Sequence, residues 1–140
     1  MALISSKLRI VLAPVVFILL CACASTANPS DDLSPAELIQ RAQEALDRNR
    51  YKTAAAFYTA LYERNRSNLD LVITAEYHIA FIHYKQGRLE ESRTRMNALL
   101  EYYNTPDEEL LPQHFKRLAQ IVINQIDEKE NRRKPFFARK

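Results

Sequence analysis

A near absence of glycine is the feature that most restricts how this chain can fold. Gly87 is the one glycine among 140 residues, where average usage of about 7% would give roughly ten. Phosphate-cradling loops and tight two-residue hairpins both depend on glycine, for close backbone approach or for positive φ angles. Helix-favouring alanine, leucine, arginine, glutamine and glutamate are frequent instead. The composition predicts one small all-α domain and argues against the glycine-rich classes of nucleotide enzyme.

Positions 1–22 have the pattern of a secretory signal peptide. Lys7 and Arg9 precede an apolar run over positions 10–20, which includes Pro14. A membrane-spanning helix needs about 20 apolar residues, so this run is too short to be one. A basic start, a short apolar stretch and small residues at its exit are typical of an exported protein.

The sequence Leu20-Cys21-Ala22-Cys23 resembles the lipobox of bacterial lipoproteins, because a branched apolar residue lies three places before Cys23 and a small residue directly precedes it. The resemblance implies cleavage after Ala22 and a diacylglyceryl thioether on Cys23. Cys21 fits less well, since Leu20 is not small. An ordinary signal peptide with incidental cysteines and an uncleaved anchor are the alternatives. Removal of Cys21 and acylation of Cys23 would leave no thiol for a disulfide or a metal.

Residues 23–34 have the small, polar composition of a flexible tether, which would hold a domain near a membrane and let it swivel. Ala24 stands where enteric bacteria tend to have an aspartate in lipoproteins retained at the inner membrane. The resemblance therefore implies a lipid-anchored protein of the bacterial cell envelope that faces the periplasm, with the outer membrane favoured over the inner membrane.

Helix-start signals divide the rest of the chain into three blocks of similar length. Ser34-Pro35-Ala36-Glu37 is a capping box, Thr105-Pro106-Asp107-Glu108 repeats the same device, and Ser67-Asn68-Leu69-Asp70 is a looser version. Apolar residues spaced by three and four then predict two helices in each of the first two blocks and one in the third. The helix before Gly87 is apolar nearly all round, so we expect it to be central.

Three sites interrupt this helical pattern. Residues 48–50 break the first block, and Gly87 breaks the second. Pro112 cannot sit comfortably inside a helix. The third block is therefore expected either to kink there or to form a short turn followed by a helix from about 112 to 131.

An internal repeat joins the three blocks, because Ala42, Ala80 and Ala119 recur at nearly equal spacing along the chain. Helix pairs that repeat at roughly 34 to 47 residues form solenoids of antiparallel hairpins. The pattern resembles the tetratricopeptide repeat at Ala42, Tyr51, Ala54, Tyr58 and Leu61, and again at Ile79, Ala80, Gly87, Leu89, Ser92, Met96 and Leu99. It departs from that repeat at Arg41, Asn49, Arg66 and Asn104 and in its longer period.

This resemblance implies an antiparallel helix-hairpin solenoid over residues 35–128, with about two repeats and a C-terminal capping helix. A generic five-helix bundle is the alternative. Residues 129–140 hold six basic residues and one acid, which indicates a basic, disordered tail. With Phe136 and Phe137, that tail is suited to anionic lipid or to an acidic partner.

The polar residues do not form a catalytic pattern. His78 and His83 are five residues apart, so they lie on opposite sides of a helix and cannot chelate one metal ion together. Carboxylates occur in runs, and no nucleophile-elbow pattern is present. We therefore predict a protein that is not an enzyme, with no catalytic residue, no metal and no cofactor other than the covalent lipid on Cys23.

Binding of a protein partner is the function that the resemblance implies, through a groove lined by the first helix of each pair. The groove positions of the family correspond here to Ile39, Gln43, Leu46, Asp47, Tyr77, Phe81, Tyr84, Lys85, Lys116, Gln120, Ile123 and Asn124. Three aromatic residues and a lysine on the central helix suit a peptide or a partner helix. The alternative is that Phe81 and Tyr84 are buried under neighbouring helices.

The sequence thus predicts a lipoprotein that acts as an adaptor or assembly subunit, bound to an unidentified envelope protein or peptide and, through its lipid, to the membrane. Nucleic-acid binding fits the basic tail but not an exported protein. Two other functions are alternatives. An accessory protein of solute uptake would have a closed, apolar pocket beneath the aromatic helix, and an envelope enzyme would depend on a specific histidine or acid.

Overall fold

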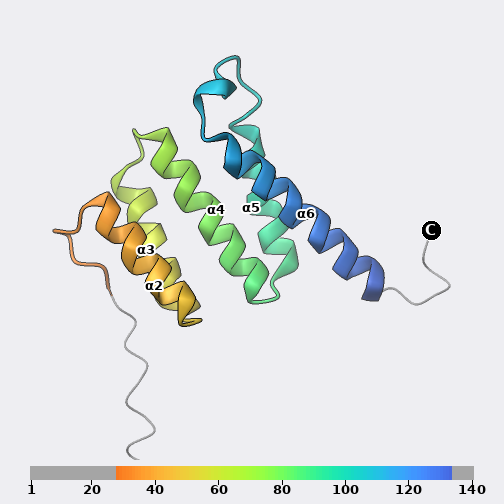
Figure 1. Cartoon of the computed structure of the whole chain (residues 1–140), viewed down its shortest axis with the longest axis horizontal. Coiled ribbons are helices and arrows are strands. Elements are labelled where there is room, and N and C mark those ends of the chain that lie inside the picture. The colour runs from red at the N-terminus through yellow and green to blue at the C-terminus, as the bar shows by residue number, and fades with distance from the viewer. Residues whose placement is uncertain (1–27, 134–140) are drawn as a thin grey trace, which may run out of the picture.

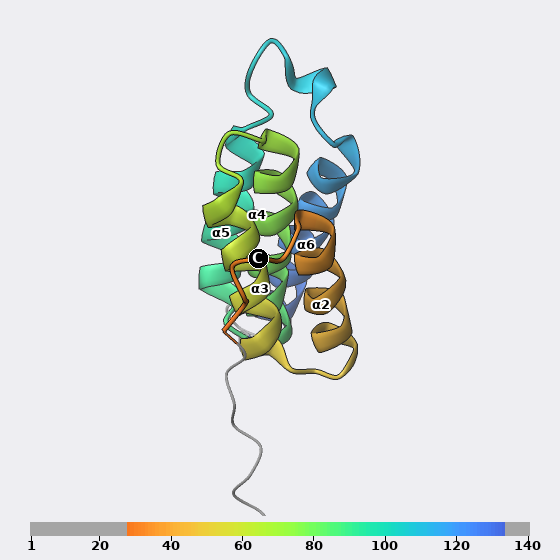
Figure 2. The same ribbon diagram turned by 90° about the vertical axis from the view of Figure 1, so that its left-hand side faces the viewer.

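The computed structural model describes residues 28–133, and within them the chain is all-helical and contains no strand (Figure 1). The elements are α2 (Pro35–Asp47), α3 (Tyr51–Arg64), α4 (Leu69–Lys85), α5 (Leu89–Glu101), the short 3₁₀ helix η1 (Glu108–Leu110) and α6 (Gln113–Arg133). Successive helices run in opposite directions, and each α-helix packs against the next (Figures 1 and 2). The predicted all-α class with five helices is confirmed. The predicted signal peptide and Cys23 lie outside the described residues.

The start of α2 is the predicted capping box. The Glu37 backbone N–H donates to Ser34 Oγ at 3.3 Å, and the Ser34 backbone N–H donates to Glu37 Oε2 at 2.9 Å. At α4 the cap is one residue later than the pattern suggested. Asn68, rather than Ser67, accepts from the Leu71 backbone N–H, at 3.3 Å.

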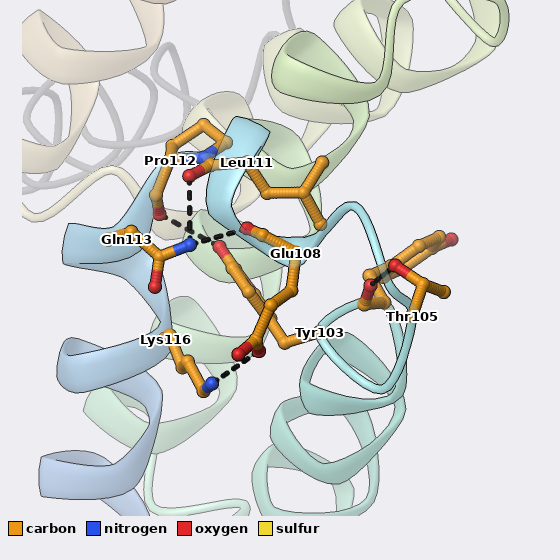
Figure 3. Close-up of polar contacts among 8 residues, drawn as sticks. Tyr103, Thr105, Glu108, Leu111, Pro112, Gln113 and Lys116 are labelled. Atoms are coloured by element: carbon orange, nitrogen blue, oxygen red, sulfur yellow. Dashed lines mark hydrogen bonds and ion pairs between the residues drawn. The ribbon is translucent and has the colours of Figure 1, made fainter.

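The helix start predicted at Thr105 is wrong. Thr105 Oγ1 instead donates to the Tyr102 carbonyl oxygen, at 3.3 Å (Figure 3). The segment from Glu108 forms only the single turn η1, and α6 begins after Pro112. A helix running through Pro112 would lose a backbone hydrogen bond and clash with the preceding turn. Of the two outcomes expected at this proline, a short turn followed by a helix is therefore the one confirmed.

Side chains around the α5–α6 connection hold this turn in place. The Tyr103 hydroxyl donates to the Pro112 carbonyl oxygen at 2.8 Å, and Gln113 Nε2 donates to the Leu111 carbonyl oxygen at 3.2 Å (Figure 3). Lys116 Nζ lies 2.6 Å from Glu108 Oε2. The turn thereby fixes where α6 begins relative to the end of α5.

The turns between α2 and α3 and between α4 and α5 have the same geometry. Gly87 has a φ of +76°, and its counterpart in the first hairpin, Asn49, has a φ of +54°. The backbone N–H of Gly87 donates to the Tyr84 carbonyl oxygen at 3.0 Å. In the same way, the backbone N–H of Asn49 donates to the Leu46 carbonyl oxygen at 2.8 Å. Asparagine tolerates this left-handed conformation better than other side chains. Asn49 can therefore occupy the turn position that Gly87 fills in the second hairpin.

Substitution of Gly87 by alanine is expected to destabilise the domain by about 1 kcal/mol. A Cβ atom at Gly87 would meet no other atom within 4 Å, so the penalty comes from the positive φ rather than from a clash. Urea unfolding of wild type, Gly87→Ala and Gly87→Asn checks this. The asparagine variant should be the less damaged of the two, and equal losses would contradict the conformational explanation.

The interior consists of two apolar cores that share α4, as the sequence suggested for a central helix. The first core lies between α2, α3 and α4, and α4 contributes Ala75, Ile79 and Ile82 to it. The second core lies between α4, α5 and α6, with Ile73, Tyr77 and Ala80 from α4. The three alanines of the predicted repeat, Ala42, Ala80 and Ala119, are all 0% exposed. None of the described helices is long and apolar enough to cross a membrane.

Helix α6 ends close to the residue 131 expected for it, inside the segment predicted to be a tail. The tail was predicted to begin at residue 129, but the helix continues through Arg133. Arg93 on α5 explains this, because its guanidinium lies 2.5 Å from Asp127 Oδ1 and 2.8 Å from Glu130 Oε2. The boundary predicted at 128 is therefore too early, and residues 134–140 lie outside the described part of the chain.

Replacement of Arg93 by methionine should loosen the end of α6 without unfolding the domain. Exposed ion pairs contribute about 0.2–1 kcal/mol each, so amide exchange over residues 127–133 should become a few times faster. Hydrogen exchange followed by mass spectrometry measures this. Arg117→Met, on the exposed surface of α6, is the matched control and should leave those amides unchanged.

Candidate partner-binding surface

Three aromatic side chains form a continuous row along α4. The rings of Tyr77 and Phe81 are 6.0 Å apart, and those of Phe81 and Tyr84 are also 6.0 Å apart. Helix α6 covers part of this row, because the Phe115 ring lies 5.0 Å from that of Tyr77 and Lys129 Nζ lies 3.8 Å from the centre of the Tyr84 ring. Tyr77 is only 6% exposed and belongs to the second core. Phe81 and Tyr84 remain half-exposed beside it.

One face of α6 borders this row. His114, Leu118, Ile121, Gln125 and Lys129 are spaced by four, three, four and four residues, so they share one side of the helix. The last of them contacts Tyr84 on α4, as described above. Leu118 and Ile121 lie between the ends of this face and are 37% and 49% exposed. We call Phe81, Tyr84, Leu118 and Ile121 the α4–α6 surface.

The positions of α6 that the resemblance assigned to a groove lie on a different face. Lys116 pairs with Glu108, and its Nζ lies 5.7 Å from the centre of the Tyr103 ring, on the side of α5. Ile123 packs against the second core, and Gln120 is exposed. In helical projection Lys116 and Ile123 point roughly opposite to Ile121, and Gln120 points about 100° away from it. The structure therefore does not bring them to the α4–α6 surface.

The predicted positions on α2 are divided between core packing and a polar cluster. Ile39 and Leu46 pack against the first core, and Gln43 bonds to α3 and α4 as described below. Lys85, at the end of α4, is exposed. Asp47 and Asn124, at the edges of the predicted groove, are exposed as well.

His78 lies in a cluster that joins α2, α3 and α4. Its ring stacks on that of Tyr58, with centroids 4.5 Å apart and planes 7° from parallel. Gln43 Nε2 donates to the Tyr58 hydroxyl at 2.6 Å and lies 3.4 Å from His78 Nε2. The buried Nδ1 atom of His78 has no hydrogen-bond partner among the described residues.

The electrostatics of this cluster make it a poor site for proton transfer at neutral pH. Burial, with a further contribution from the charge of His114, lowers the pKa of His78 to about 4. Burial also raises the pKa of the Tyr58 hydroxyl above its ordinary value, against the opposing effect of the Gln43 hydrogen bond. At pH 7 both groups are therefore neutral, and the cluster serves packing and hydrogen bonding.

The described residues offer few other places for chemistry. Within 28–133, no group of three or more His, Cys, Asp and Glu side chains is arranged to hold a metal ion. A hollow of about 420 Å³ between α2 and α3 is lined by charged residues, among them Glu37, Arg41 and Arg48. Beneath the aromatic row lie buried side chains of the second core, among them Met96, Val122 and Ile126.

The fold thus defines a small helical domain with a partly exposed apolar surface, and the comparisons with known proteins add one relative. A protein of Treponema pallidum (strain Nichols), described as "Uncharacterized protein", is 31% identical over 110 residues. The match covers 76% of this chain but 44% of the relative, so the chain spans less than half of that protein's length. No protein-family model matches the chain. No solved structure matches it either.

Sequence reasoning missed Leu118 and Ile121 as members of this surface. Leu118 continues the three-and-four apolar spacing of the last helix, which marks an apolar face. Ile121 carried no such signal. Its exposure depends on how far α6 is rotated against α4, and that rotation is a tertiary property.

Proposed function

We propose that the chain is a bacterial lipoprotein, anchored through Cys23, whose helical domain binds a protein partner in the cell envelope. It would act as an adaptor or assembly subunit, without catalysis. The partner would present an amphipathic helix or a peptide with large apolar side chains. The α4–α6 surface is the observation that carries this proposal.

The proposal includes the finer fold, a tetratricopeptide-like solenoid of two hairpins and a final helix. Two observations support it. The positive-φ turns at Asn49 and Gly87 have matching hydrogen bonds in successive hairpins, and the small residues Ala42, Ala80 and Ala119 are fully buried at nearly the same period. Solenoids of this kind present one face of their first helices to a partner.

The exposure of the α4–α6 surface is what favours partner binding over a purely structural role. Apolar side chains of leucine and isoleucine lose about 1.5–3 kcal/mol of burial energy when they stay in water. Single exposed apolar residues are common, but Leu118 and Ile121 share a helix face with Lys129, which contacts the ring of the partly buried Tyr84. An apolar group bordered by Lys129 and Lys85 has the apolar centre and polar rim of an interface.

Substitution of Leu118 and Ile121 by serine is expected to abolish partner capture while the domain stays folded. Both side chains are more than a third exposed, so their loss should alter stability little, whereas an apolar anchor in an interface is worth about 2 kcal/mol or more. Affinity capture from membranes of the native host, compared between wild type and variant, measures the effect. Circular dichroism of both proteins verifies the fold.

Leu110→Ser is the matched control, because Leu110 is 80% exposed in the turn before α6, away from the α4–α6 surface. It should retain every partner. A variant Leu118→Ser/Ile121→Ser that captures the same proteins as wild type would overturn the assignment of this surface. Tyr77 is unsuitable for such a test, since it is buried and its loss would damage the second core.

A further inference from the structure

The described domain carries opposite charges at its two ends. The turns between α2 and α3 and between α4 and α5 lie at one end, together with the C-terminal end of α6 (Figure 1). Within residues 47–52 and 85–88 there are five basic residues and one acid, a net charge of +4. Residues 101–111, at the other end, contain four acids and no basic residue, a net charge of −4. We call the first of these the basic end.

The basic residues of the two turns are available for binding. Arg48, Arg50, Lys52, Lys85 and Arg88 are all exposed, and no acidic partner among residues 28–133 is within ion-pair distance of them. Asp47 is the acid within these turns, and the exposed Glu90 and Glu91 follow Arg88 in the first turn of α5. At the third corner of the basic end, α6 closes with Arg132 and Arg133.

The N-terminal segment is held so that the chain enters from the same direction. Arg64, at the end of α3, donates to the carbonyl oxygens of Ser30 and Pro29 at 2.8 and 3.0 Å and to Asp31 Oδ1 at 3.0 Å. Asn28 borders the middle of α3, where a hollow lies between this segment and Ala56 and Thr59. From Arg64 back to Asn28, the segment therefore runs along α3 toward the basic end (Figures 1 and 2).

Cys23 is five residues before Asn28, a stretch that reaches at most about 17 Å. A lipid on Cys23 therefore keeps the middle of α3 within roughly that distance of a bilayer. The first residue of α3, Tyr51, is five residues before Ala56, or about 8 Å along the helix. The reach is enough for the basic end to meet the surface of the bilayer.

We propose that the basic end docks on anionic lipid headgroups and orients the anchored domain, with the α4–α6 surface standing to the side and the acidic end pointing away. Each lysine or arginine close to an anionic membrane strengthens association about fivefold. This inference rests on the lipid anchor of the proposed function and adds a fixed orientation.

The test uses the full chain, isolated from membranes and reconstituted into vesicles. A fluorophore is attached at Gln86→Cys near the basic end or at Asp107→Cys near the acidic end, and nitroxide-labelled headgroups quench it when it is close. We expect strong quenching at position 86 in vesicles containing phosphatidylglycerol, weak quenching in phosphatidylcholine or at about 1 M salt, and weak quenching at position 107 throughout.

Two charge variants distinguish a specific role of the basic end from an effect of the total charge of the protein. Lys52→Gln/Lys85→Gln should lower the ratio of docked to undocked molecules about 25-fold. Arg66→Gln/Arg117→Gln, which removes the same charge from exposed positions elsewhere, should leave the ratio near that of wild type. Equal losses in the two variants, equal quenching in both lipids, or salt-sensitive binding of an acidic protein in place of the lipid would overturn the proposal.

Mass spectrometry of the same preparation keeps the two proposals distinguishable. A protein that carries acyl chains but shows no anionic preference retains the anchor and refutes the docking. A protein without acyl chains refutes the anchor. It is then mixed with preformed vesicles, where preferential sedimentation with anionic lipid supports the basic end as a lipid-binding surface and its absence refutes it.

Discussion

Acidification from pH 7 to about pH 4.5 is expected to lower the free energy of unfolding by about 2 kcal/mol through His78 alone. The imidazole is packed against Tyr58 in a cluster that bridges three helices. Burial makes the charged form unfavourable there, and the pKa of His78 falls from 6.5 to about 4. The size of this effect makes His78 the principal acid-sensitive group that we expect in the described fold.

The direction in which pH changes the free energy of unfolding depends on whether the folded or the unfolded state binds the His78 proton more tightly. In the unfolded chain the histidine titrates near 6.5, and in the folded domain its pKa is about 4. Between these values the unfolded state takes up a proton that the folded state does not, so stability falls as the pH falls. The stabilisation is complete above pH 6.5 and is lost progressively down to about pH 4. Burial lowers the pKa of His83 as well, which adds to the loss in the same direction.

Urea unfolding at pH 7 and pH 4.5 measures this difference. His78→Phe keeps a ring against Tyr58 but cannot be protonated, so its loss of stability between the two pH values should be smaller than that of wild type by about 2 kcal/mol. His114→Gln is the matched control at an exposed histidine. This variant removes only the minor electrostatic contribution of His114 to the pKa of His78. It should therefore preserve most of the loss of stability at low pH. An unchanged pH response in His78→Phe would contradict the assignment to this group.

The helices were predictable where local signals and apolar spacing agree. The capping box at Ser34 and the glycine at position 87 placed the start of α2 and the end of α4, and both are local in origin. The signal at Thr105 has the same chemistry as that at Ser34. It fails because Pro112 lies seven residues further on, so a helix begun there could not continue. A capping pattern thus predicts a helix only when the following turns can extend it.

The binding surface was predictable in part. The aromatic row on α4 is visible in the sequence, but how deeply each of its members is buried is not. Tyr77 is in the core, whereas Phe81 and Tyr84 are half-exposed. On α6 the family positions lie on a different face from Leu118 and Ile121, because the same repeat register does not fix how a final helix is rotated against its neighbours. That rotation depends on contacts such as Arg93 with Asp127, which no single helix encodes.

Substitution of Cys23 by alanine is expected to abolish lipid attachment and to release the protein from the membrane fraction. The proposed thioether forms on the sulfur of this residue, which alanine lacks, so the effect should be complete rather than graded. Growth with a radiolabelled fatty acid, followed by membrane fractionation of wild type and variant, measures both results. Cys21→Ala is the matched control. It removes the other cysteine of the chain and should leave labelling intact.

The same pair of variants distinguishes the anchor from the basic end as the cause of membrane association. The two acyl chains of the proposed diacylglyceryl group are enough for stable attachment, whereas a polybasic surface adds a weaker, salt-sensitive interaction with anionic lipid. If Cys23→Ala removes the label but leaves the protein sedimenting with anionic membranes at low salt, the basic end is sufficient for binding. If labelling survives in Cys23→Ala, the lipobox assignment is wrong. The orientation along α3 would then need another anchor upstream of Asn28.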